Sequence, residues 1–202
     1  MTSRALISLA AASILIAVAG CHISVDKSKS GDEKNVKIET PLGGLHVRSD
    51  QTSAADVGLP AYTGAHLSTG SDGDKSADVH LGFGQWQLRV RAVTYETSDS
   101  QDKVVAFYKS ALGRYGDVLQ CDGKKAVGSP TVTHEGLTCD EEHGKGHVNV
   151  DLTSSDHLSL MAGSRHHQHI FAIKNGGGAD TRFSLVELQL PGGGDQESSS
   201  SD

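Results

Sequence analysis

The segment 85–97 constrains the fold most, because its side chains alternate between apolar and polar over a long run. Successive side chains of a β-strand point to opposite faces, so this alternation predicts a strand. The two faces carry these side chains: Trp86, Leu88, Val90 and Ala92 on the apolar one, and Gln87, Arg89 and Arg91 on the polar one. The chain is therefore expected to build a sheet with one buried face.

A helix is predicted directly after this strand. Ser98, Asp99 and Ser100 offer N-cap side chains, and Gly116 ends the pattern. Between them, apolar residues recur at helical spacing: Val104, Phe107, Tyr108, Ala111, Leu112 and Tyr115. The chain is expected to contain one main amphipathic helix.

Shorter alternating segments, separated by Gly, Asp and Ser clusters, predict further strands. They lie at 77–81, 118–121, 131–139, 146–153, 157–161, 168–174 and 182–190, with a hairpin at 36–49 around Gly43-Gly44. Because strands far outnumber helices, the fold class predicted for 36–190 is α+β. It is expected to be a mostly antiparallel sheet with one helix packed on one face. The hairpin 36–49 is either a small annex or the edge of the same sheet.

Near the start of the chain, the basic residue Arg4 is followed by an apolar run at 5–18, which is too short to span a membrane. The run ends in Val18-Ala19-Gly20-Cys21, which resembles a bacterial lipoprotein lipobox. The resemblance implies a signal peptide at 1–20 and a diacylglycerol on the Cys21 thiol, with a further acyl chain such as palmitate on the new amino terminus. An ordinary secretory signal is the alternative. His22 in place of Asp resembles an outer-membrane address in Gram-negative bacteria.

The two ends of the mature chain have the composition of solvated segments. Residues 21–35 are polar and charged and lack aromatic residues, which predicts a flexible tether between the lipid and the domain. Residues 191–202 are rich in Gly and Ser, which predicts a disordered tail.

Cys121 and Cys139 are the cysteines left once Cys21 carries lipid. An even pair in an exported, oxidising setting predicts a disulfide. A metal site or a reactive thiol is the alternative, but neither cysteine has a Cys-x-x-Cys partner.

Composition and motifs argue against several functions. The formal net charge is −7 and no basic cluster exists, so nucleic-acid binding is not expected. The chain lacks a Gly-x-Ser-x-Gly elbow, a P-loop and a Ser-x-x-Lys motif. Asp72, Asp74, Ser76 and Asp78 have the spacing of a calcium loop, but Ala77 and Phe83 stand where Gly and Glu are needed. We therefore expect no enzyme and no cofactor.

The chain holds eleven histidines, and three of them lie close together: His166, His167 and His169. On a strand, His167 and His169 share a face, and imidazole nitrogens there could bind Zn²⁺ or Cu²⁺. A further ligand could come from His143 or His147. The alternative is the polar end of a hairpin.

Three stretches resemble a group of bacterial envelope proteins of uncharacterised function: Thr40-Pro41-Leu42-Gly43-Gly44-Leu45, Tyr62-Thr63-Gly64-Ala65 and the segment that begins Phe107-Tyr108. Thr63 replaces their usual Pro. The resemblance covers 36–190 and implies an exported domain without a transferable activity. We expect a lipid-anchored, non-enzymatic structural or interaction module whose partner is another envelope protein or a cell-wall polymer. A periplasmic metal-binding protein is the alternative.

Overall fold

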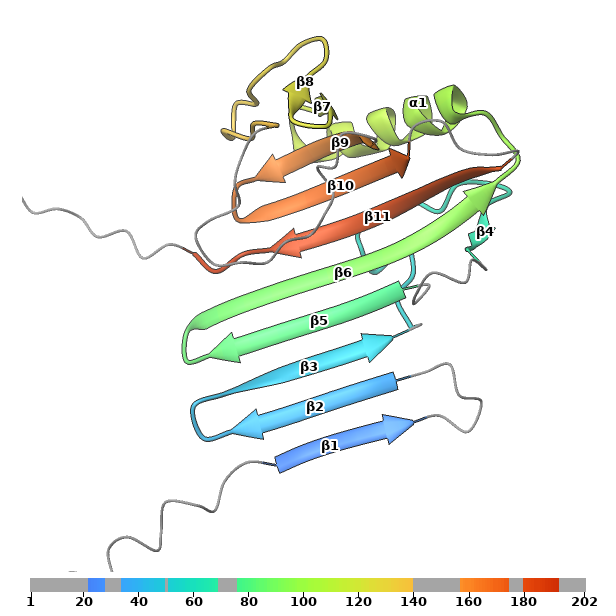
Figure 1. Ribbon diagram of the computed structural model, residues 1–202. Coiled ribbons are helices and arrows are strands. Elements are labelled where there is room, and N and C mark those ends of the chain that lie inside the picture. The colour runs from blue at the N-terminus through green and yellow to red at the C-terminus, as the bar shows by residue number, and fades with distance from the viewer. Residues whose placement is uncertain are drawn as a thin grey trace, which may run out of the picture.

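One antiparallel sheet organises the computed structural model, which describes residues 22–27, 34–49, 51–68, 76–139, 157–174 and 180–192. Within these residues the sheet has eleven strands: ten follow the order β1-β2-β3-β5-β6-β11-β10-β9-β7-β8, and the eleventh, β4, pairs with β6 (Figure 1). The strands are β1 (His22–Lys27), β2 (Lys34–Thr40), β3 (Gly43–Ser49), β4 (His66–Leu67), β5 (Ser76–Phe83), β6 (Trp86–Thr97), β7 (Leu119–Asp122), β8 (Lys125–Ala126), β9 (His157–Ser164), β10 (His167–Lys174) and β11 (Thr181–Gln189). The helix α1 (Gln101–Leu112) continues into the 3-10 turn η1 (Gly113–Tyr115).

The α+β class predicted from the sequence is confirmed, since the described residues form a mostly antiparallel sheet and a single helix. The alternating segment 85–97 is β6, and α1 follows it directly. The hairpin predicted at 36–49 is β2 and β3, which belong to the main sheet and do not form an annex. Its turn is Pro41-Leu42 and not the predicted Gly43-Gly44, because both glycines belong to β3 and pair with Thr40 and Glu39 of β2. The Thr40 hydroxyl accepts a hydrogen bond from the Gly43 amide at 3.1 Å across this turn.

Two further predictions are corrected. The tether predicted for 21–35 contains β1, because residues 22–27 pair with β2. The strand predicted at 131–139 is a loop, because its backbone bonds to itself: the Thr133 amide donates to the Leu137 carbonyl at 3.1 Å and the Gly136 amide to the Thr133 carbonyl at 3.0 Å. The segment 146–153 and most of the predicted tail lie outside the described residues.

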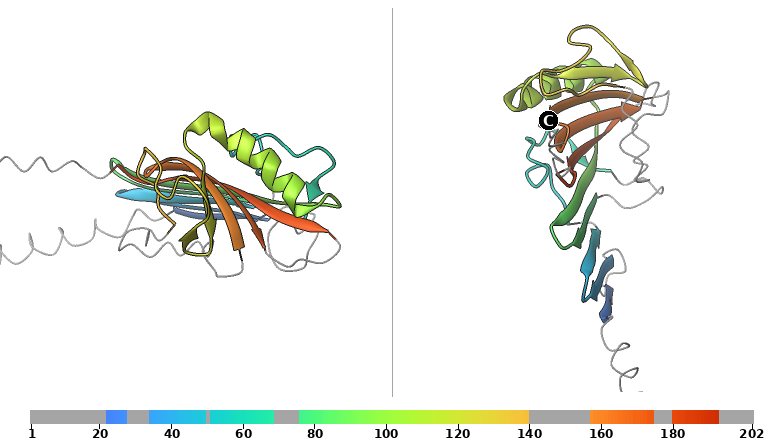
Figure 2. Two further views of the ribbon diagram at one scale, coloured as in Figure 1. Left: turned by 90° about the horizontal axis from the view of Figure 1, so that it is seen from above. Right: turned by 90° about the vertical axis from the view of Figure 1, so that its left-hand side faces the viewer.

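The main core lies where α1 crosses one face of β9, β10 and β11 (Figure 2, left). Tyr108 of α1 is fully buried and stacks on Phe171 at 4.9 Å between ring centroids. Its hydroxyl donates to the Pro60 carbonyl at 3.1 Å, which fastens the loop 51–65 to the helix. Val104 and Leu112 are also fully buried in this cluster. Within the described part of the chain, no helix is long and apolar enough to cross a membrane.

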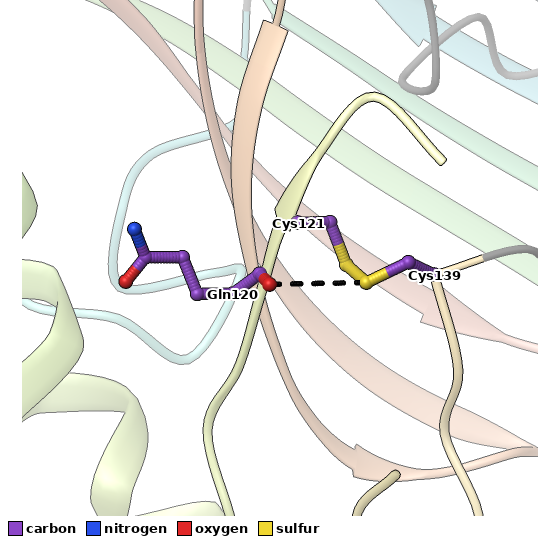
Figure 3. The surroundings of a disulfide bond; sticks show 3 residues. All are labelled: Gln120, Cys121 and Cys139. Carbon is purple, nitrogen blue, oxygen red and sulfur yellow. Dashed lines mark hydrogen bonds between the residues drawn. A yellow bond between two sulfur atoms is a disulfide. The ribbon is translucent and has the colours of Figure 1, made fainter. Parts of the chain in front are cut away.

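A second, smaller core lies on the opposite face of the sheet and contains the predicted disulfide. Cys121 of β7 and Cys139 are joined by an S–S bond of 2.01 Å, which confirms that prediction (Figure 3). The Sγ of Cys139 also lies 3.8 Å from the carbonyl oxygen of Gln120; a disulfide sulfur carries no proton, so this is a contact without donation. Leu119 and Leu137 are buried beside the bridge.

Replacing both Cys121 and Cys139 by Ala is expected to lower the free energy of unfolding by about 3 kcal/mol. The bridge closes a loop between residues 18 apart, and its loss returns chain entropy to the unfolded state. Urea unfolding of the oxidised protein and of the double variant measures the difference. Equal midpoints and equal slopes for the two proteins would contradict this expectation.

Candidate interaction surface

Four strands carry the sheet beyond the part that α1 covers. We call β1, β2, β3 and β5 the wing; it continues from the start of β6 to the terminal strand β1. Figure 2 (right) shows the wing extending away from the layer that contains α1. The apolar cluster that α1 forms with β9, β10 and β11 contains no residue of the wing among the described residues. The wing therefore lies beyond the part of the sheet that α1 covers.

One face of the wing is lined by two rows of apolar side chains, which we call the apolar ladders. Direct cross-strand partners make the first row: Ile23, Ile38, Leu45, Leu81 and Leu88. The second row is built in the same way: Val25, Val36, Val47, Val79 and Val90. Ile23 is 64% exposed and Leu88 only 4%, so the ladders run from the core outward to an open edge.

The opposite face of the same strands is polar. Its rows are also direct cross-strand partners: Ser24, Lys37, His46, His80 and Arg89 in one, and Asn35, Arg48, Asp78, Arg91 and Glu187 in the other. Because side chains alternate along a strand, a slip of one residue in any pairing would mix the two faces. The wing is thus a two-faced layer, apolar on one side and charged on the other.

The polar face ends in a buried ion-pair network where the wing joins the core. Glu187 is 6% exposed and accepts hydrogen bonds from Arg91 at 2.6 Å and Gln189 at 2.8 Å, and pairs with His167 Nε2 at 2.9 Å. Burial alone would raise the pKa of Glu187, but these bonds outweigh it and hold the pKa below the ordinary value of 4.5. The two polar rows are joined by Arg89, which donates to the Asp78 carboxylate through Nε at 3.1 Å and Nη2 at 2.8 Å.

The three histidines predicted as metal ligands are only partly brought together. His167 and His169 share a face of β10 with ring centroids 4.9 Å apart, while His166 lies exposed in the preceding turn. The ring nitrogen Nδ1 of His169 is bonded to the Val57 carbonyl at 3.0 Å, and its ring stacks on Tyr115 at 3.7 Å. Burial lowers the pKa of His169.

No group of three or more metal-ligating side chains is found among the residues that the structure describes, so the predicted set does not assemble there. His143 and His147, the other candidate ligands, lie outside those residues, as does most of the calcium-like loop.

Comparison with protein-family models, with curated proteins and with solved structures finds no match to this chain. The resemblance to envelope proteins therefore stays a prediction. The apolar ladders were not predicted from the sequence, although each of their strands alternates apolar and polar residues. The Ile-Ser-Val alternation at 23–25 was hidden by the charged residues that follow it.

Replacing Glu187 by Gln is expected to lower the free energy of unfolding at pH 7 by about 2 kcal/mol, because charge-assisted hydrogen bonds to Arg91 and His167 are weakened. The pKa of Glu187 is depressed in the folded state, so its stabilisation is complete above pH 4.5 and is lost as the pH falls through the folded-state value. The gap between wild type and variant should therefore close in acid.

Urea unfolding at pH 7 and at pH 3 measures that gap. Glu39→Gln is the matched control, since Glu39 is half exposed and its pair with Lys37 contributes little. A gap for Glu187→Gln that is the same at both pH values, or no larger than that of the control, would refute the expectation.

Proposed function

We propose that this chain is a lipid-anchored protein of the bacterial cell envelope that acts without catalysis, as an interaction module. The lipobox-like Val18-Ala19-Gly20-Cys21 supports the anchor, and the resemblance of 36–190 to envelope proteins supports the compartment. In a Gram-negative cell, His22 favours the periplasmic side of the outer membrane. The apolar face of the wing is the surface through which the module binds.

The observation that carries this proposal is the exposure of the apolar ladders at the terminal strand. Ile23 and Val25 are 64% and 54% exposed and stand on one face of β1, beside the partly buried Val36 and Ile38 of β2. Scattered apolar side chains are ordinary on a protein surface, but a contiguous set marks an interaction site. Burying such side chains contributes about 25 cal/mol per Å² of apolar surface.

The chemistry of this face favours a protein partner over a cell-wall polymer. The ladders offer methyl groups of Ile, Leu and Val, and they carry no hydrogen-bonding side chain. A hydroxyl-rich polysaccharide would lose its hydration against such a surface without receiving hydrogen bonds in return. An apolar strand face or helix face of another envelope protein buries the same groups without that cost.

The terminal strand gives the partner a second kind of contact. β1 is the last strand in the order of the described strands, so its outer backbone edge is where a partner could add a strand. The two contacts adjoin, because β1 also carries the exposed ends of both ladders. A partner that adds a strand to β1 can extend the apolar face without a break.

Photo-crosslinking in living cells tests the proposal. Replacing Val25 by the photoreactive amino acid p-benzoylphenylalanine is expected to yield a crosslink to one envelope protein, because this side chain lies on the apolar face. The same replacement at Ser24, the neighbour on the polar face, is the matched control and should yield no such product. A product of twice the chain mass would identify the partner as a second copy.

Two results would count against the proposal. Equal crosslinking from Val25 and Ser24, or none from either, would contradict the proposal that the partner binds the apolar face of the wing. An unmodified thiol at Cys21, found by mass spectrometry of the native protein, would contradict the proposed lipid anchor.

A further inference from the structure

We propose that one end of the wing rests on the lipid bilayer, with Leu42, Phe83 and Trp86 dipping into the interface beside the acyl chains of Cys21. This inference rests on the proposed lipid anchor and adds an orientation to it. It assigns a membrane-contact site to three residues that neither the ladders nor the ion-pair network uses. We call these residues the end cluster.

The sheet register places the start of β1 and the end cluster at the same end of the wing. His22, the residue after Cys21, pairs with Glu39 next to the β2–β3 turn that carries Leu42. In β5 and β6, Phe83 pairs with Trp86 across the next turn. Figure 1 shows the start of β1 and both turns along the left edge of the sheet.

The anchor leaves little slack between this end and the membrane. Because β1 begins at His22, the predicted lipid site is the residue directly before the sheet, about 3.3 Å along the chain. Neighbouring strands lie about 4.8 Å apart, so the four intervals from β1 to β6 span about 19 Å. Acyl chains in the bilayer hold the start of β1 at the headgroup region, and a sheet that lies along the membrane with this end brings the end cluster to the same depth.

The side chains at this end suit a membrane interface. Leu42 is 82% exposed, Phe83 51% and Trp86 43%, and the rings of Phe83 and Trp86 lie 6.2 Å apart. The Phe83 ring lies over Gly43, where a Cβ would be 2.5 Å from its Cδ1 atom. Gly43 thus lets an aromatic ring lie against the turn that carries Leu42. Trp and other aromatic side chains are enriched where water meets lipid.

Charge at this end does not oppose the contact. Glu39 is the acidic residue of β2 nearest the turn, and its carboxylate is paired with Lys37 at 2.6 Å and lies 3.8 Å from His46. Gln85 and Gln87 beside Trp86 are neutral. Docked in this way, the strands stand on the bilayer with both faces of the wing exposed at its surface, so the apolar ladders are held open to a neighbour in the same membrane.

Trp86 is the single tryptophan of the chain, so its fluorescence reports on this end alone. The native, acylated protein is placed in phosphatidylethanolamine–phosphatidylglycerol vesicles with and without bromine on the acyl chains. Bromine quenches tryptophan only at short range, and we expect at least a twofold loss of emission. Leu42→Asp should reduce the quenching by half or more. Val132→Asp, at a site 53% exposed in the loop after β8, is the matched control and should leave it unchanged.

Mass spectrometry of the same sample separates the two proposals. Acyl chains on Cys21 with unquenched Trp86 would overturn the docking while the lipid anchor stands. An unmodified Cys21 would overturn both. Equal quenching in Leu42→Asp and Val132→Asp would overturn the assignment of the end cluster as the contact.

Discussion

The register between β5 and β6 is the constraint on which the rest of the structure depends. It aligns Leu81 with Leu88 and Val79 with Val90, and on the other face it aligns Asp78 with Arg91. Each further strand of the wing inherits this alignment, so the separation of apolar and charged side chains is carried outward to β1. Shifting the pairing by one residue would move arginines to the face of the valines and would separate Asp78 from Arg91.

The two faces of the sheet differ in how fully their apolar side chains are buried. Over β9, β10 and β11 the helix covers one face, and Tyr108 fills the space between them. The ladders lie on the opposite face, where Val90 packs against the smaller core around the disulfide, and they end in the open at Ile23 and Val25. A stable core and an available surface are therefore joined in one continuous sheet. The ion pairs of Glu187 and Arg91 stand at the junction and tie β11 of the core to β6 beside the wing.

The proposed anchor, the end cluster and the ladders are arranged so that a lipid on Cys21 would fix the orientation of the sheet. A lipid on Cys21 would act directly on β1, because no long tether intervenes. The end of the sheet would then meet the bilayer, and the apolar face would be held at a fixed height above it. Restricting the module to one orientation lowers the entropy lost when it meets a partner anchored in the same membrane.

Local patterns within the sequence determined β6, the helix that follows it and the cysteine pair, because alternation, helical spacing and residue type are encoded in neighbouring positions. They did not predict β1, whose six residues become a strand only by pairing with β2. They also could not show that Ile38, Leu45 and Leu81 form one row, or that Phe83 lies over Gly43. His167 and Glu187 meet across 20 residues for the same reason. Which strands pair, and in which register, is decided by contacts between distant segments as the whole sheet buries its apolar face.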